Sequence, residues 1–343
     1  MSGRANAEVV LAFSGGIDSC AAVDILRGWG YSVTALMLSL VEGDDDAVQG
    51  ARARAQEMGV KFVLLDCRER FRSEIIDNFV EEYIAGRTPA PCTRCNPLIK
   101  WHMLVEYAKS VGAQHIATGH YFGVTNYGGK LYVSRGVDPR KDQSYYLWGL
   151  SQEALSMALT PMADRIKEDI KAQSTLKKES MGVCFLRGCH YSELIESAGH
   201  KIERGDIIDS RGEVVGEHRG LAYYTIGQKR GEGIPSGVAV TKINGTKNQI
   251  IVGENSELFA SRLLVGECNI VDREEWLTSR EIKVMVRGLG RNPEGYAHIE
   301  ATEYEGQYLV YLSNPAWACA EGQPVVFYVG KRVIGGGYLL RAI

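Results

Sequence analysis

Short apolar runs alternate with amphipathic stretches over the first third of this 343-residue chain. The apolar runs begin near Glu8, Tyr31, Val60 and His115, and the stretches between them have helical periodicity, including a single long helix predicted over 70–86. Parallel strands need crossovers of this length, because a tight turn cannot return the chain to the same end of a sheet. The alternation therefore predicts an α/β domain: a doubly wound parallel sheet with helices on both faces.

From about residue 200 the pattern changes. Short alternating runs such as "VAVTKINGTKNQIIVG" are separated by Gly, Asn or Asp turns, and "INGTKN" is typical of a hairpin. This half is predicted to be all-β, with a boundary near residue 260. We expect three domains: 1–198, a catalytic α/β domain; 199–260, a central small β domain; and 261–343, a C-terminal barrel-like β domain.

Composition is that of a globular protein, with 45% hydrophobic and 24% charged residues. The net charge of −3 means that any nucleic-acid surface must be a local one. No apolar run reaches the roughly 18 residues of a membrane span, and "MSGRANAEVVLAF" has no signal-peptide pattern. We expect a cytoplasmic protein with no membrane partner, in which the eight thinly spread cysteines stay reduced.

The segment "FSGGIDS", residues 13–19, joins the first predicted strand to the first predicted helix. Gly15 and Gly16 allow a tight turn that brings backbone N–H groups close to a ligand, Ser14 and Ser19 add hydroxyls, and the helix start adds a positive dipole. The segment has neither the lysine of a Walker A loop nor the GxGxxG spacing. It predicts a phosphate loop, exposed enough that Asp18→Ala and Ser14→Ala leave the fold intact.

Two cysteines three residues apart, Cys92 and Cys95, lie in "TPAPCTRCNPLIKW". A disulfide does not suit a reducing compartment. A structural zinc site needs four ligands, and the chain has no second CxxC and no matching histidine spacing. A redox pair and a catalytic centre both stay open, because each needs partners elsewhere in the chain.

The SGGxDS loop resembles the pyrophosphate-binding loop of the PP-loop ATP-pyrophosphatase (adenine nucleotide alpha hydrolase-like) superfamily. From about residue 8 to the C-terminus, further blocks occur in the order found in the tRNA-specific 2-thiouridylase family. These blocks are "GRTPAPCTRCNPLIKW", "IATGHY", "RGVDPRKDQSYYLWGLS", "KKESMGVCFL", "GEHRGLAYYTIGQKRGEGI" and "GQPVVFY…GGGYL".

This resemblance implies an ATP-dependent tRNA sulfurtransferase, which adenylates the 2-oxygen of the wobble uridine and replaces it with sulfur. Asp18 and Ser19 would lie where Mg²⁺ and phosphate are bound. The implied ATP-binding residues are Ala12, Phe13, Ser14, Gly15, Gly16, Ile17, Asp18, Ser19, Leu38 and Gly119.

The resemblance also implies tRNA as a partner, together with a sulfur donor that is either a persulfide carrier protein or free sulfide. We expect a monomer or a weak dimer. The implied tRNA-binding residues are Ala90, Pro91, His120, Lys141, Asp142, Gln143, Arg287, Gly288 and Gln323.

The family's two working cysteines map onto Cys95 and Cys184, one carrying a persulfide sulfur and the other resolving the S–S bond. Cys92 stands where the family usually has aspartate. The set Cys92, Cys95 and Cys184 resembles thiouridylases that hold a [4Fe–4S] cluster with three cysteines. A persulfide pair with Cys92 as an extra thiol, and a zinc or inert site, are the alternatives. Cys189 is a spare candidate ligand.

The remaining cysteines are expected to be buried small apolar residues: Cys20, Cys67, Cys268 and Cys319. The segment between residues 160 and 180 is shorter than is usual in the family, which bears on the choice of tRNA. Two other functions compete with the main prediction. One is a related sulfurtransferase that acts on another tRNA position or acceptor, and the other is a non-catalytic tRNA- or metal-binding paralogue.

Overall fold

The computed structural model describes residues 7–174, 182–186, 188–288 and 290–343. These residues form two compact units, which we describe separately. The first comprises residues up to 75, 92–185 and 331–334; the second comprises 76–91, 186–330 and 335–343. Each unit is therefore built from several chain segments, and the three continuous domains expected from the sequence stay a prediction.

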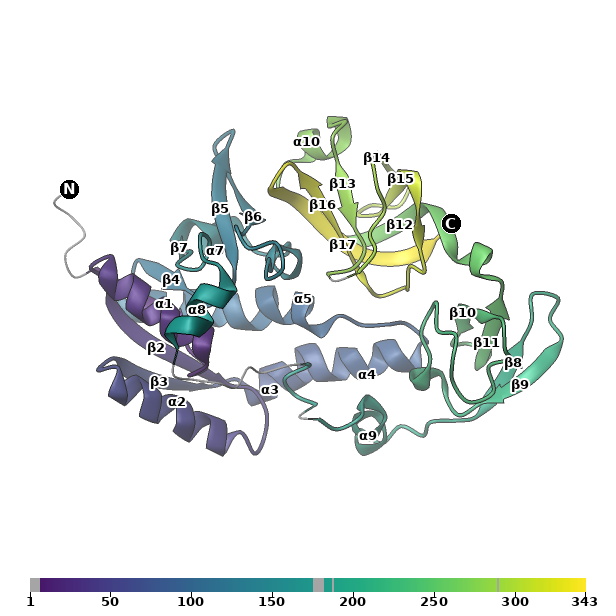
Figure 1. Ribbon diagram of the computed structural model, residues 1–343, viewed down its shortest axis with the longest axis horizontal. Coiled ribbons are helices and arrows are strands. Elements are labelled where there is room, and N and C mark those ends of the chain that lie inside the picture. The colour runs from purple at the N-terminus through teal and green to yellow at the C-terminus, as the bar shows by residue number, and fades with distance from the viewer. Residues whose placement is uncertain (1–6, 175–181, 187, 289) are drawn as a thin grey trace. The chain divides into compact units, whose positions relative to one another are not determined.

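A five-stranded parallel sheet forms the centre of the first unit, with strand order β3-β2-β1-β4-β7 (Figure 1). Its strands are β1 (Glu8–Ala12), β2 (Ser32–Ser39), β3 (Lys61–Asp66), β4 (His115–Ala117) and β7 (Ala158–Leu159). Val9, Val10 and Leu11 of the central strand are fully buried. Full burial of each such side chain stabilises the fold by about 1.5–3 kcal/mol. The predicted α/β class with a parallel sheet is confirmed.

Helices α1 (Ile17–Gly28), α2 (Asp45–Glu57) and α6 (His102–Val111) pack against this sheet. Each brings small or apolar residues to the core at helical spacing, for example Ala22, Val23 and Leu26 of α1. Helix α6 ends at Gly112, which adopts the left-handed conformation (φ 74°) that glycine tolerates best. The strand–helix alternation of the sequence thus appears as crossovers that cover the parallel strands.

The helix predicted over 70–86 is not a single α-helix. It consists of α3 (Arg68–Phe71), a π-helical turn (Arg72–Ile76) and α4 (Asp77–Ile84). A second π-helical turn (Asn96–Trp101) lies between α5 (Pro91–Cys95) and α6. A π turn changes the hydrogen-bond register without changing the apolar pattern much, so periodicity alone does not reveal it.

An antiparallel hairpin, β5 (Phe122–Tyr127) and β6 (Lys130–Arg135), follows β4 in the first unit (Figure 1). Gly128 and Gly129 both have positive φ in its two-residue turn, as a hairpin turn of this kind requires. The sequence prediction omitted this hairpin, although "TNYGGKLYV" contains its turn signal.

The second unit carries the predicted all-β structure. One sheet has the order β10-β11-β8-β9, with strands β8 (Gly205–Ile208), β9 (Val214–His218), β10 (Ala239–Asn244) and β11 (Gln249–Gly253). The predicted hairpin at "INGTKN" joins β10 to β11. A further sheet has the order β13-β16-β17-β12-β15-β14. Its strands are β12 (Phe259–Ile270), β13 (Lys283–Met285), β14 (Ala297–Ala301), β15 (Tyr308–Trp317), β16 (Pro324–Val329) and β17 (Arg332–Ala342).

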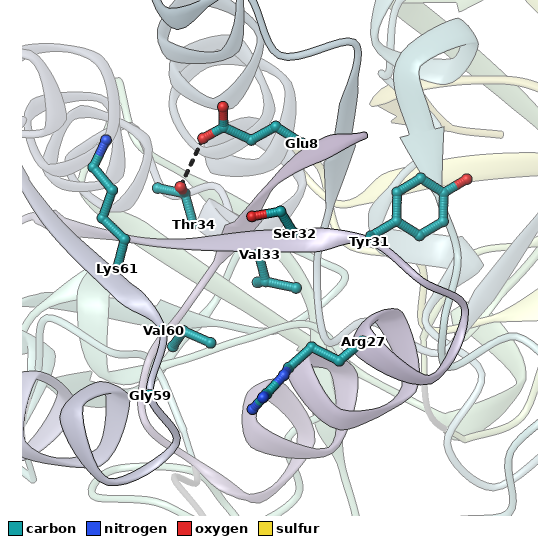
Figure 2. Close-up of a pocket in the computed structure, with 9 residues that line it drawn as sticks. All are labelled: Glu8, Arg27, Tyr31, Ser32, Val33, Thr34, Gly59, Val60 and Lys61. Carbon is teal, nitrogen blue, oxygen red and sulfur yellow. Dashed lines mark hydrogen bonds between the residues drawn. The ribbon is translucent and has the colours of Figure 1, made fainter. Parts of the chain in front are cut away.

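A polar cavity of about 300 Å³ lies where β1, β2 and β3 begin. Figure 2 shows Glu8, whose carboxylate accepts a 2.8 Å hydrogen bond from the Thr34 hydroxyl; Arg27 and Lys61 also line the cavity. This is the amino edge of the parallel sheet, whereas the predicted phosphate loop follows the carboxyl end of β1. Within the described part of the chain, no helix is long and apolar enough to cross a membrane.

Candidate active site

The predicted phosphate loop forms a tight turn between β1 and α1. Gly15 has φ 71°, and a Cβ there would lie 2.9 Å from Cα of Ala51 on α2. A side chain at this position would therefore be strained in its backbone and would also clash with α2. Gly15 is required by both constraints, and it lets the loop backbone pack closely against α2.

Three polar groups organise the loop around the first turn of α1. The Ser14 hydroxyl accepts a hydrogen bond from Gly16 N–H at 3.3 Å and lies 3.3 Å from the Ser19 hydroxyl. Ser19 donates to the Gly16 carbonyl at 3.0 Å. Ser14 is exposed, whereas Phe13, Ile17 and Ser19 are buried. Ser14 and the loop backbone are therefore the groups of this segment best placed to meet a phosphate, at the positive end of a twelve-residue helix.

The other expected nucleotide residues lie at the same carboxyl edge of the sheet. Leu38 is near the end of β2, and Gly119 follows β4. A Cβ on Gly119 would lie 3.0 Å from the carbonyl carbon of Asp18, so glycine lets the loop after β4 pack on the start of α1. Strand order reverses between β1 and β4, and open parallel sheets bind ligands at such a switch point.

Asp18, which is partly exposed, pairs with a buried lysine. Lys167 Nζ donates to Asp18 Oδ1 at 2.6 Å and to Oδ2 at 2.7 Å, and the Tyr121 hydroxyl donates to Oδ1 at 2.8 Å. Lys167 is 2% exposed. The expectation that Asp18→Ala leaves the fold intact rests on an exposed loop, whereas Asp18 pairs with a buried ammonium; we now expect the substitution to lower stability.

Sequence reasoning missed Lys167, Tyr121 and Asp138 as members of this site. The Asp138 carboxylate is 2% exposed and accepts the backbone N–H of Lys167 at 3.0 Å. Tyr121 stands directly after the "TGH" block, a signal that could have found it. Lys167 is separated from Asp18 by 149 positions and has no comparable local signal.

Cys92 and Cys95 lie in one short helix, α5, which continues into the π-helical turn beginning at Asn96. The buried Asn96 amide donates 3.0 Å hydrogen bonds to the carbonyls of Cys92 and Tyr146. Its Oδ1 atom has no hydrogen-bond partner within the described residues. Asn96 thus fixes the turn that holds the two thiols. π-helical turns are rare and frequently occur at functional sites.

Cys184 belongs to the same unit as Cys92 and Cys95, in a turn whose next residue, Phe185, packs edge-on against Phe71 with ring centres 5.8 Å apart. Burial among protein atoms raises the pKa of Cys95 to about 11, and the nearby thiols of Cys184 and Cys92 also raise it. Burial likewise raises the pKa of Cys92 and of Cys184. Cys92 and Cys184 still have solvent-exposed surface. The three thiols are therefore near neighbours that stay protonated at neutral pH.

Lys100 is a charged residue whose ammonium acts on all three of these thiols. Its ammonium opposes the rise in pKa at all three cysteines. It also lies 3.4 Å from Nε2 of His120. Sequence reasoning missed Lys100, although it lies in the same "NPLIKW" segment. A cation beside thiols favours their thiolate form, which is the nucleophilic one.

Thiolate sulfur is a suitable ligand for an iron–sulfur cluster. Among the side chains that the structure describes, however, no three Cys, His, Asp or Glu residues form a group that could hold a metal ion. As they lie here, Cys92, Cys95 and Cys184 do not make a ligand set. The cluster therefore stays a prediction.

His120 was expected to contact tRNA. Its Nδ1 lies 2.9 Å from the Thr118 hydroxyl and its Nε2 faces the Lys100 ammonium. Because an ammonium can only donate, Nε2 accepts and the proton is on Nδ1. Burial, followed by the charge of Lys100, holds the pKa of His120 well below its usual value. Both ring nitrogens of His120 therefore have polar partners within the protein.

The expected tRNA residues Lys141, Asp142 and Gln143 follow the hairpin. Asp142 accepts hydrogen bonds from Gly136 N–H and from the backbone and hydroxyl of Ser144, at 2.9–3.2 Å. Gln143 exchanges two 2.9 Å hydrogen bonds with the backbone of Tyr121. Lys141 is half-buried. Asp142 and Gln143 therefore shape this loop and position Tyr121, whatever they contact in a complex.

The other expected tRNA residues belong to the second unit. Gln323 donates through its side-chain amide to the carbonyls of Thr88, at 2.7 Å, and Pro89, at 3.3 Å, which fixes the segment leading to Ala90 and Pro91. Arg287 donates to the Ala318 carbonyl, and its guanidinium lies 5.2 Å from the Trp317 ring centre. The half-buried Gly288 follows it.

The cysteines expected to be buried divide into two pairs. Cys67 and Cys319 are buried as predicted, whereas Cys20 and Cys268 are only partly buried. Burial raises the pKa of all four, to about 11 for Cys20, Cys67 and Cys319 and to about 12 for Cys268. Cys189, the spare candidate ligand, is exposed and lies in the second unit.

A parallel sheet with a glycine-rich loop at its switch point defines a nucleotide-binding α/β class, and the family comparisons agree. Residues 7–188 match a family described as tRNA methyl transferase HUP domain. Residues 194–254 match a tRNA methyl transferase PRC-barrel domain, and residues 260–339 match an aminomethyltransferase beta-barrel domain.

Similar proteins extend over nearly the whole chain. A protein of Bacteroides fragilis named tRNA-specific 2-thiouridylase MnmA 3 is 36% identical, covering 96% of this chain and 93% of its own length. Proteins named tRNA-specific 2-thiouridylase MnmA from Clostridium perfringens and Natranaerobius thermophilus are 35% and 36% identical; the matches cover 97% of this chain and 98% and 97% of theirs. The chain belongs to the tRNA-specific 2-thiouridylase family.

Proposed function

We propose that this protein is an ATP-dependent tRNA sulfurtransferase that converts a uridine of tRNA to 2-thiouridine. The observation that carries the proposal is one unit holding both a phosphate loop at the switch point of its sheet and a group of three neighbouring thiols beside Lys100. The names of the relatives support the same reaction.

ATP would bind with its phosphates on the backbone of residues 14–16 and on the Ser14 hydroxyl. Leu38 and Gly119, at the same sheet edge, are proposed to line the adenosine. Mg²⁺ would be bound near Asp18 and Ser19. Attack of the uridine 2-oxygen on the α-phosphate would release pyrophosphate and leave an adenylated oxygen, which is a good leaving group.

Cys95 and Cys184 are proposed to deliver sulfur. One thiol carries a persulfide received from a donor, and its terminal sulfur attacks the activated carbon while AMP leaves with the original oxygen. The other thiolate attacks the S–S bond, which frees the thiolated base and leaves a Cys95–Cys184 disulfide. A thiol reductant restores both groups. Lys100 assists by favouring thiolate in a site that otherwise keeps thiols protonated.

An iron–sulfur centre on Cys92, Cys95 and Cys184 is the second candidate for the sulfur source. The observation favouring it is that all three thiols are near neighbours, with Cys92 adding a soft donor to the pair. We derive no step through such a centre.

The tRNA contacts expected from the resemblance are proposals of the same kind. Lys141 and Arg287 would contribute positive charge. Their contacts with tRNA would be weakened by salt, since a chain of net charge −3 binds nucleic acid only through local cations.

Nucleosides from tRNA of cells with and without the gene test this function. Deletion should abolish 2-thiouridine. A plasmid copy should restore it, a Cys95→Ser copy should not, and a Cys268→Ser copy, which alters a cysteine of β12 with no proposed role, should. Loss of a methylated nucleoside in place of the thiolated one would identify a methyltransferase and would overturn the proposal.

A further inference from the structure

The most unusual charged group of the first unit is a lysine with almost no solvent contact. The Lys167 side chain is 3% exposed, yet both oxygens of Asp18, which is 35% exposed, lie within 2.7 Å of its ammonium. An isolated ammonium is costly to bury, so a position like this persists only when partners compensate the charge. Lys167 is therefore held in place by the acidic residue of the phosphate loop itself.

Lys167 is also held through its backbone. Its N–H donates to Asp138 Oδ2, and Asp138 Oδ1 accepts the N–H of Arg140, both at 3.0 Å. The Tyr121 hydroxyl donates to the same Asp18 Oδ1 atom that accepts from Lys167. The Lys167 ammonium thus has a preset position beside the first turn of α1.

The phosphate loop has an acidic residue, Asp18, in the first turn of α1, and the negative charge of Asp18 opposes phosphate binding. A triphosphate carries several negative charges, and a carboxylate a few ångströms away would repel it. The segment 13–19 contains no cation, unlike a Walker A loop. Lys167 is a cation, and its ammonium lies within 2.7 Å of the Asp18 carboxylate, so it can offset that repulsion.

We propose that Lys167 is the phosphate-binding cation of this loop. In the free protein it neutralises Asp18, and when ATP binds, its ammonium donates to a phosphate oxygen; Asp18 would then be available to hold Mg²⁺. Tyr121 and Asp138 are positioning residues that keep the ammonium at the loop. This inference rests on the proposed use of ATP and adds the residue that recognises its phosphates.

The test is binding of ATP alone to the full-length protein, measured calorimetrically in EDTA so that metal plays no part. Lys167→Met should weaken binding about 10- to 100-fold, the equivalent of one hydrogen bond to a charged group. Lys167→Arg, which keeps the charge, should bind better than Lys167→Met. Lys171→Met removes a charge from the same helix, α8 (Lys167–Gln173), and should bind as the unmodified protein does.

The double variant Asp18→Asn/Lys167→Met distinguishes binding of phosphate by Lys167 from mere neutralisation of the Asp18 carboxylate. Thermal unfolding shows which variants are folded. If Lys167 binds phosphate, the double variant binds ATP more weakly than Asp18→Asn alone, because neutralising the carboxylate does not replace the lost phosphate contact. Equal affinity of the double variant and of Asp18→Asn, or unchanged affinity in Lys167→Met, would overturn the inference and leave the proposed function standing. An unmodified protein that binds no ATP, with or without Mg²⁺, would overturn both.

Discussion

The ammonium of Lys100 lies 3.4 Å from Nε2 of His120, and the same charge acts on all three thiols of the candidate site. Burial raises the pKa of Cys92, Cys95 and Cys184, and Lys100 opposes that rise. Histidine at 120 stays neutral, because burial and the neighbouring cation both lower its pKa. Lys100 is therefore a positive charge that acts on three thiols and a histidine, all of which burial favours in their neutral forms.

Removing this charge should make Cys95 less reactive. Lys100→Met is expected to raise the pKa of Cys95, and each unit of increase lowers the thiolate fraction about tenfold at a fixed pH. The rate of iodoacetamide alkylation, followed by mass spectrometry of the Cys95 peptide at pH 8, measures the change. Lys100→Arg keeps the charge and should alkylate at nearly the original rate. An unchanged rate in Lys100→Met would show that the lysine does not act on the thiol.

Cys95 reactivity should also depend steeply on pH. With a pKa of about 11, its thiol is protonated across the neutral range, so thiolate rises about tenfold for each pH unit. The alkylation rate of Cys95 should therefore keep increasing through pH 9 and level off only near 11. A plateau below pH 9 in the ATP-free protein would contradict the buried environment of this thiol.

The conformation of Gly15 makes a stability prediction. Gly15→Ala places a side chain in the left-handed region and 2.9 Å from Ala51 Cα, and should lower the free energy of unfolding by about 1–3 kcal/mol. Gly28→Ala is the matched control. Gly28 ends α1 with nothing within 4 Å of an added Cβ, so that variant should be neutral or slightly more stable. Equal stability of the two variants in urea denaturation would refute the strain at Gly15.

Cys92 distinguishes the two routes of sulfur delivery. If Cys95 and Cys184 act as a persulfide pair, Cys92→Ser should thiolate tRNA from a persulfide donor at close to the original rate in iron-free buffer that contains Mg²⁺. Cys95→Ser and Cys184→Ser should be inactive under the same conditions. If Cys92→Ser instead loses both activity and the iron bound after anaerobic reconstitution, the second candidate replaces the first.

Local features of this fold were predictable and long-range ones were not. The strand, the turn and the helix around Gly15 are adjacent in sequence, so the alternating pattern and the glycines predict them together. Asp18 and Lys167 are separated by 149 positions, and only the folded chain shows that they pair. The π-helical turn Arg72–Ile76 leaves the apolar spacing nearly intact, so a single ordinary helix was predicted over 70–86. Asp142 and Gln143 were predicted by resemblance as tRNA contacts, and their hydrogen bonds to Ser144 and Tyr121 could not be inferred from motif matching.

Reconstitution of the reaction is the decisive experiment: the purified protein is incubated with unmodified tRNA, ATP, Mg²⁺ and a persulfide or sulfide donor, and the nucleosides are analysed by mass spectrometry. We expect 2-thiouridine that requires ATP, with AMP and pyrophosphate formed in step with it, and none from Cys95→Ser. Thiolation without ATP, or consumption of ATP without any thiolated nucleoside from either sulfur donor, would refute the proposed function.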